Sequence, residues 1–168
     1  MGGPAKMATQ RLVLLAALAL VAGCANFAQL SPGTSSRQVE ALVGAPTEVW
    51  KEADGSEVWE YPMGPFGFET YMVSFGPDRT VRQVRQVLTE ENIVALRVGM
   101  PRDEVRRLLG KPREIRMFDL SNEEIWSWRY REWQVRNMEL HVQFDRSSGT
   151  LKAYSRSQEE PSGSDKRS

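Results

Sequence analysis

The feature that most constrains this chain is a helix-like pattern that occurs twice, in residues 33–46 and 99–112. Each copy starts at a glycine, carries apolar residues at helical spacing and ends in Gly-x-Pro, a sequence typical of a helix C-terminus. Five positions of the first copy, and Glu48 just after it, recur 66 residues later: Gly33, Val39, Leu42, Gly44, Pro46 and Glu48 as Gly99, Val105, Leu108, Gly110, Pro112 and Glu114. We therefore expect one helical element to be present twice.

The repetition continues into the segments that follow each helix. Trp59 and Tyr61 match Trp128 and Tyr130, and Val73 and Phe75 match Val142 and Phe144, all at an offset of 69. Because the offset changes only where turns are expected, the extra residues lie where a duplicated fold tolerates insertions. The sequence predicts a first repeat over residues 33–88 and a second over residues 89–157.

Local signals predict the fold of each repeat. Ser35 with Gln38 is typical of a capping box, and Thr89 is a good N-cap for a second-repeat helix over residues 90–96. Alternating apolar and polar residues then predict a meander of three or four antiparallel strands in each repeat. We expect an α+β fold: two tandem helix(-helix)–antiparallel β-meander repeats, joined edge to edge into one sheet that helices cover on one face. The opposite face would be open.

The N-terminus has the features of an export signal. Lys6 and Arg11 precede an apolar run over residues 12–21, which is shorter than the ~20 residues that span a membrane. The run ends in Val-Ala-Gly-Cys24, which looks like a bacterial lipobox, and Cys24 is the only cysteine. We expect a lipoprotein signal peptide over residues 1–23, lipidation at Cys24 and a tether over residues 24–32. An ordinary secretory signal, or a buried helix with an incidental cysteine, is the alternative.

The charge balance argues against nucleic acid as a partner, since Lys and Arg together number 22 and Asp and Glu also 22. The charges are unevenly shared: residues 33–88 carry 5 basic and 8 acidic groups, whereas residues 97–157 carry 13 and 9. This excess in the second repeat is either a solvated surface or a surface that meets an acidic partner or anionic lipid. Residues 158–168 contain no apolar side chain, and we expect a disordered tail there.

Residues Thr89–Pro112, followed by Trp128-x-Tyr130 and Val142-x-Phe144, resemble the SmpA/OmlA (BamE-like) family of small outer-membrane lipoproteins. The resemblance implies a helix–helix–β-meander fold and attachment to the β-barrel assembly machinery. The wider superfamily includes tandem-repeat β-lactamase inhibitor proteins, which bind through an open sheet. The chain departs from BamE-type proteins in having two such units, and in having Pro101 where the family usually offers a Ser or Thr cap.

Catalytic and metal-binding motifs are not found in the sequence. His141 is the only histidine, and the strand alternation places it on a solvated side with Glu139 and Gln143. No HExxH, CxxC, phosphate-binding glycine loop or Ser/His/Asp pattern is present. We therefore predict a protein that is not an enzyme and has no cofactor and no metal.

Aromatic side chains at two loops are the candidates for a contact site. The loops between the second and third strands carry Phe66 and Phe68 in the first repeat and Trp133 in the second. These side chains either fold back onto the sheets or, if exposed, anchor a partner protein, because aromatic and arginine side chains that become buried at an interface dominate its energy. The predicted partner-binding residues are Trp133, Arg131, Arg129, Arg136, Phe66 and Phe68.

Together these expectations define a lipoprotein held at the periplasmic face of the outer membrane through Cys24. It would act as a non-catalytic protein-binding scaffold for an envelope protein, in outer-membrane protein assembly or envelope integrity. The alternative is a binding inhibitor of a periplasmic enzyme, such as a β-lactamase or a peptidoglycan hydrolase. A lipid or peptidoglycan-fragment carrier would need a deep pocket that this fold does not predict.

Overall fold

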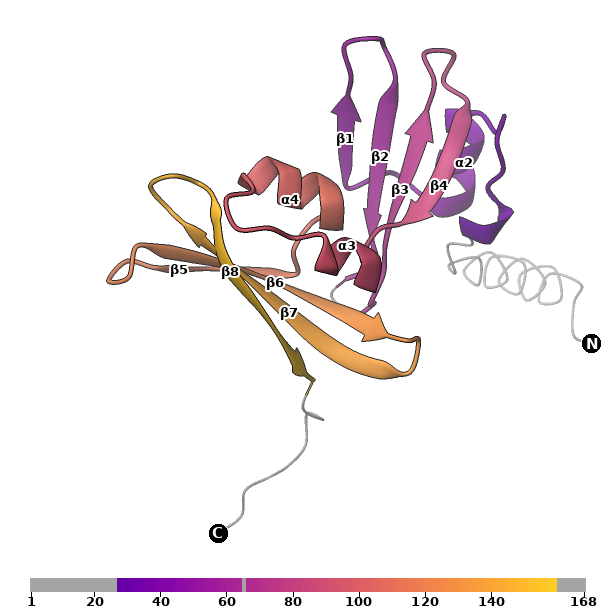
Figure 1. Ribbon diagram of the computed structural model, residues 1–168. Helices are drawn as coiled ribbons and strands as arrows, with labels where there is room; N and C mark the ends of the chain where they lie inside the picture. The colour runs from indigo at the N-terminus through magenta and orange to yellow at the C-terminus, as the bar shows by residue number, and fades with distance from the viewer. Residues whose placement is uncertain (1–26, 65, 160–168) are drawn as a thin grey trace, which may run out of the picture.

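The computed structural model describes residues 27–64 and 66–159 and contains two four-stranded antiparallel sheets with short helices (Figure 1). The predicted signal peptide and Cys24 lie outside the described residues. In chain order the elements are η1 (Phe27–Gln29), α2 (Ser36–Val43), β1 (Glu48–Lys51), β2 (Glu57–Pro62), β3 (Thr70–Phe75), β4 (Val81–Gln86), α3 (Glu90–Val94), α4 (Arg102–Leu109), β5 (Glu114–Phe118), β6 (Glu123–Glu132), β7 (Arg136–Asp145) and β8 (Leu151–Gln158). The mixed α+β class is confirmed, and each sheet is a simple meander, β1-β2-β3-β4 and β5-β6-β7-β8.

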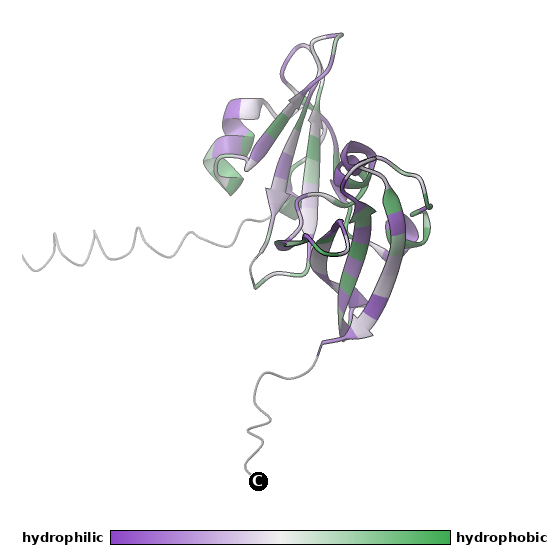
Figure 2. Ribbon diagram, turned by 90° about the vertical axis from the view of Figure 1, so that its left-hand side faces the viewer, coloured by the Kyte–Doolittle hydropathy of each residue, from purple (hydrophilic) through white to green (hydrophobic). Residues whose placement is uncertain are grey.

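A separate hydrophobic core lies against each sheet. The first combines Val39 of α2 with Trp59, Val73 and other strand residues of the first sheet. The second combines helix residues such as Ile93 and Val105 with strand residues that include Trp128 and Leu140. Along β6 and β7 buried residues alternate with more exposed ones, and the ribbon shows this as bands of opposite hydropathy (Figure 2). The period of two is what a sheet with one packed face requires.

The two halves of the chain share detailed features as well as element order. A backbone pair ties the segment before α2 to β4, since Gly33 donates to Val81 and Val81 donates to Thr34. Gly99 and Leu151 make the corresponding pair before α4, with Leu151 donating to Met100. The register between the third and fourth strands also shifts at matching places, at Ser74/Phe75 and at Gln143/Phe144.

Helices α2 and α4 each end at a glycine, as the repeated pattern predicts. Gly44 has φ 87° and ψ −177°, and Gly110 has φ 81° and ψ −172°. This backbone region is open almost only to glycine, which is why a glycine ends each of these helices. An aromatic side chain holds each glycine carbonyl: the Tyr61 hydroxyl donates to Gly44 at 3.2 Å, and the Trp128 indole donates to Gly110 at 3.1 Å.

The expectation of one continuous sheet is wrong, because the described strands form two separate sheets. Helix α4 lies between them (Figure 1). One side of α4 contributes Val105 and Leu109 to the second core, and its charged side faces the first sheet, where Arg106 meets Glu60. An edge-to-edge junction would have left Glu60 on an open face, whereas here the helix buries it.

Both ends of the described segment belong to the fold where the sequence predicted a tether or a tail. Phe27 and Leu30 belong to the first core, although we expected residues 24–32 to form a tether. Gln158 completes β8 and Glu159 pairs with Arg129, so the predicted tail does not begin at residue 158. Residues 160–168 lie outside the described residues.

Candidate binding surfaces

A buried carboxylate joins the two halves of the molecule. Glu60 has no exposed surface, and its two oxygens lie 2.5 Å from Arg106 Nη1 and 2.5 Å from the backbone nitrogen of Lys111. Burial of an ionised group is costly unless a charge and hydrogen bonds compensate for it, and here both do. These contacts fix α4 and the segment after it against the first sheet. Sequence reasoning did not find this pair, because its partners are 46 residues apart and belong to no motif.

Trp50 adds a second contact between α4 and the first sheet. The guanidinium carbon of Arg107 lies 4.5 Å from the centre of a Trp50 ring, and that of Arg106 lies 5.4 Å from it. Arg107 also pairs with Glu52 at 2.6 Å. Helix α4 therefore packs on the part of this sheet face that carries Trp50 and Glu60, on the side that points away from α2.

The corresponding face of the second sheet has no helix over it among the described residues, and we call it the open face (Figure 1). A shallow groove of about 420 Å³ crosses it. Its central residues are Arg116, Phe118, Ile125, Ser127, Glu139, His141, Gln143 and Ser155. The open face is therefore a mixed surface of charged, polar and apolar groups.

Polar contacts order the side chains of the open face. Glu114 pairs with Arg116 at 2.8 Å, and this hydrogen bond lowers the pKa of the Glu114 carboxyl from its ordinary value. His141 Nδ1 lies 2.9 Å from the Ser127 hydroxyl, and His141 Nε2 lies 3.6 Å from Glu139. His141 thus lies on the solvated side of its strand, as predicted.

The β6–β7 hairpin ends in a turn of unusual residues. Trp133 and Gln134 have φ of 47° and 63°, and Val135 donates to Glu132 at 3.1 Å. This geometry is a type I′ turn, for which Asn-Gly is the preferred pair, because non-glycine residues with bulky side chains are strained at positive φ. The side chains of Trp133 and Val135 are nevertheless 70% and 82% exposed.

The β2–β3 loop lies beside this hairpin. Phe68 packs against β6: its ring centre is 4.5 Å from the guanidinium carbon of Arg129 and 4.7 Å from that of Arg131. Phe66 of the same loop is 85% exposed. The structure thus brings together aromatic residues that the sequence had placed on two equivalent loops.

The six predicted contact residues divide into two groups. Phe68 and Arg129 make contacts within the molecule, since Phe68 stacks on the arginines and Arg129 pairs with Glu159 at 2.7 Å. The others are exposed. Arg136 pairs with Glu132 at 3.0 Å and lies 5.5 Å from the centre of the Trp133 ring. We call the tip surface the four exposed predicted residues, Phe66, Arg131, Trp133 and Arg136, together with Val135, an exposed residue of the same hairpin turn that the sequence had not singled out.

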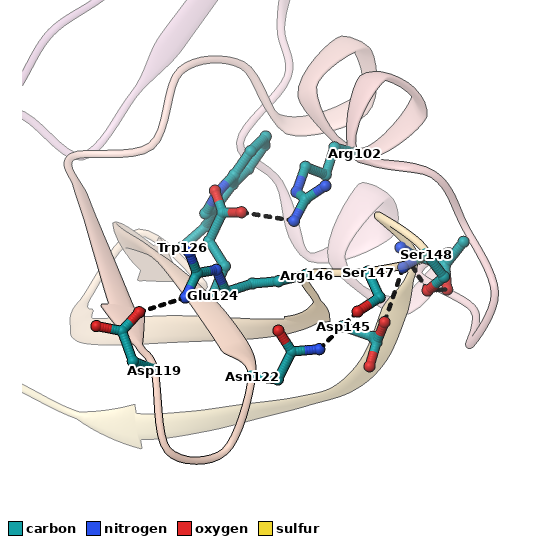
Figure 3. Close-up of polar contacts among 10 residues, drawn as sticks. Arg102, Asp119, Asn122, Glu124, Trp126, Asp145, Arg146, Ser147 and Ser148 are labelled. Carbon is teal, nitrogen blue, oxygen red and sulfur yellow. Dashed lines mark hydrogen bonds and ion pairs between the residues drawn. The ribbon is translucent and has the colours of Figure 1, made fainter.

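The opposite end of the second sheet is held by polar contacts (Figure 3). Arg102 of α4 pairs with Glu124 at 2.7 Å, and Glu124 accepts a hydrogen bond from the Trp126 indole. The two turns at this end are joined by Asp119–Arg146 and Asn122–Ser147 contacts. Asp145 accepts from Ser148, which lowers the pKa of the Asp145 carboxyl from its ordinary value.

In residues 27–64 and 66–159, no group of three or more His, Cys, Asp or Glu side chains is arranged to hold a metal ion. A crevice of about 330 Å³ lies between the β2–β3 loop and the second sheet and is lined by Lys111, Arg113 and Arg129 among others. None of the helices in the described part of the chain has the length and apolar character that a membrane span requires.

Comparison with known families identifies the second half of the chain. Residues 86–148 match the family model of the outer membrane protein assembly factor BamE domain. They include α3, α4 and most of the second sheet, so the class of fold is the helix–helix–meander of that domain. The resemblance to the BamE-like family that the sequence predicted is therefore confirmed for this segment.

Solved structures give weaker similarities. A candidate β-lactamase inhibitor protein from Streptococcus mutans is 15% identical over 76% of this chain and 84% of that protein, with a TM-score of 0.32. An extracellular protein containing an SCP domain from Bacillus anthracis is 13% identical over 77% of this chain and 44% of that protein, with a TM-score of 0.29. Both TM-scores are low, so neither similarity defines the function of this chain. No curated protein matches the sequence significantly.

Proposed function

We propose that this protein is a lipoprotein, anchored through Cys24 at the periplasmic face of the outer membrane, that acts there as a non-catalytic protein-binding scaffold. The match of residues 86–148 to the outer membrane protein assembly factor BamE domain carries the proposal. It supports a role around outer-membrane protein assembly, with a component of the β-barrel assembly machinery as the partner. The Val21–Cys24 lipobox supports the anchor.

The first half of the chain is proposed to be a second copy of the same unit. Its support is the shared element order, the matching glycine helix ends and the matching backbone pairs of Val81 and Leu151. The two copies are proposed to have different roles. Helix α4 packs on part of one face of the first sheet, so the first copy braces the second, and the second copy presents a sheet face without a helix over it in the described part of the chain.

The partner protein is proposed to bind the open face of the second sheet. This face is free of helices, carries the groove, and offers Phe118 as an exposed apolar side chain beside Arg116. Central apolar and arginine side chains with a polar surround are typical of protein interfaces. Of the contact residues that the sequence predicted on the β2–β3 loop and the β6–β7 hairpin, only Arg129 also lines this groove.

Crosslinking of the full-length protein in native membranes, followed by mass spectrometry, tests the proposal. We expect barrel-assembly components among the products, and we expect a Cys24→Ser form to lose both palmitate labelling and tight membrane association. Capture should fall about tenfold in an Arg116→Ala/Phe118→Ala variant, which corresponds to about 1.4 kcal/mol. The matched control is Val94→Ala, which truncates an exposed apolar residue on α3.

Two results would contradict the proposal. Wild-type protein that does not incorporate palmitate would contradict anchoring through Cys24. Capture of a soluble periplasmic hydrolase or β-lactamase in place of membrane partners, with loss of that enzyme's activity, would support the inhibitor alternative. A lower melting temperature in the open-face variant would mean that Arg116 and Phe118 have a structural role.

A further inference from the structure

The start of the described chain lies at one particular end of the first sheet. The Phe27 ring stacks on Tyr71 with a centroid distance of 4.2 Å and meets Tyr61 edge-on at 5.3 Å. Tyr61 and Tyr71 face each other across β2 and β3, one residue pair before Pro62 and Thr70, where the β2–β3 loop begins. The chain therefore enters the fold at the loop end of the first sheet.

The tip surface lies at this same end. Phe68 of the β2–β3 loop contacts Arg129 and Arg131 near the end of β6, and the β6–β7 turn follows within a few residues. Phe68 therefore links the loop end of the first sheet, where the chain enters, to the β6–β7 hairpin that carries the exposed Trp133 and Val135. In Figure 1 the lower ends of β2 and β3 lie near α3, and the tip of β6 and β7 extends to the lower right of them.

The anchor point can lie only a short distance away. Cys24 precedes Phe27 by three residues, and an extended chain of that length spans at most ~10 Å. Phe27 is itself fixed in the first core. A lipid-modified Cys24 would therefore hold this end of the protein close to the bilayer, with little room for a partner protein between them.

The composition of the tip surface fits a lipid–water interface. Tryptophan is enriched at that interface, where its ring contacts acyl chains and its N–H remains hydrated. Arg131 and Arg136 can keep their charged ends among headgroups while their stems cover apolar surface. The strained turn at Trp133 and Gln134 indicates that exposure of these side chains is maintained at a cost in stability.

We propose that the tip surface docks on the lipid bilayer that holds the Cys24 anchor, as a second membrane contact. This inference rests on the lipidation of Cys24 in the proposed function. It also orients the molecule. β6 and β7 each have ten residues and so span roughly 33 Å, which places the Asp119–Asn122 end of the second sheet far from the membrane. The open face then stands away from the bilayer, accessible to a partner.

Site-specific photocrosslinking in native membranes tests the proposal on the full-length, lipidated protein. Benzoylphenylalanine is placed at Phe66, Trp133 or Val135, and at Leu120 as the control. Leu120 is also fully exposed and apolar, but it lies in the turn at the opposite end of β6. We expect phospholipid adducts, read by mass, from the three tip positions and at least fivefold fewer from Leu120.

A variant that keeps the fold gives a second measurement. Trp133→Asn suits the type I′ turn, so the melting temperature should rise slightly. Lipid adducts from position 66 should fall severalfold in this variant. Val98→Asn, which replaces an exposed apolar residue away from the tip, should leave them unchanged.

Adducts to a protein at position 133, or equal lipid labelling at positions 133 and 120, would overturn the inference. Palmitate labelling of Cys24 in the same samples separates the two proposals. A labelled protein without lipid adducts at the tip refutes only the docking. An unlabelled protein refutes the anchor on which the docking depends.

Discussion

The two halves of the molecule differ most at a pair of equivalent positions. Glu60 lies between Trp59 and Tyr61 in β2, and Arg129 lies between Trp128 and Tyr130 in β6. Glu60 is fully buried against α4, whereas Arg129 lies on the side of the second sheet that α4 does not cover, between Phe68 and Glu159. Two strands with the same aromatic pattern therefore present opposite charges to different surroundings.

This difference shows how two similar units can take different roles. The aromatic residues on either side point into each unit's own core and support the same fold. The residue between them points to the opposite face of its sheet, away from that core. It can therefore differ between the two units without changing the core. In the first unit it binds Arg106 of the next unit, and in the second it helps to hold the β2–β3 loop.

The largest effect is expected from removal of the buried carboxylate. Glu60→Ala leaves Arg106 without its partner and the Lys111 amide without its acceptor, so we expect a loss of about 3–5 kcal/mol in the free energy of unfolding. Arg129→Ala removes a partly exposed pair and should cost about 1 kcal/mol. Urea unfolding measures both, and equal losses would mean that the Glu60 contacts do not distinguish the halves.

The glycines that end the two helices allow a matched test of the contact between the halves. A Cβ on Gly44 meets no atom within 4 Å, so Gly44→Ala should cost only the strain of its backbone, about 1–2 kcal/mol. A Cβ on Gly110 would lie 2.5 Å from Thr70 Cγ2 of the first half. Gly110→Ala should therefore cost about 2 kcal/mol more. Similar melting temperatures for the two variants would contradict the close approach.

The smallest effects are expected at the helix starts. Ser35 and Gln38 form a capping box at α2, whereas Pro101 at α4 makes no side-chain hydrogen bond. Ser35→Ala should lower stability by about 1 kcal/mol, and Pro101→Ser should raise it by about 0.5 kcal/mol. Thermal unfolding gives both values. A destabilised Pro101→Ser variant would show that the proline is favoured for its rigidity.

Local signals were sufficient to predict the elements of both halves. The Ser35–Gln38 box and the Thr89 cap lie where the sequence placed them, and the strand alternation predicted which side of β7 carries His141. These features depend on neighbours within a few residues. The chain entry was misjudged because Phe27 and Leu30 pack on strands more than 30 residues away, and no local pattern records such contacts.

Part of the predicted contact site could also be found from local sequence patterns. Hairpin ends were recognisable, so the sequence found Phe66 and Trp133. It did not show that Phe68 would fold under Arg129 and Arg131, since that contact joins the two halves.

By itself, the sequence determined the helix-and-meander order of both halves and the residues of their cores, because periodicity and turn residues act over short distances. Only the tertiary structure decided that the sheets stay apart, that α4 buries Glu60, and that one sheet face remains free. Those outcomes depend on charge pairing and packing between residues that are about 50 positions apart, and a linear pattern does not specify how such surfaces meet.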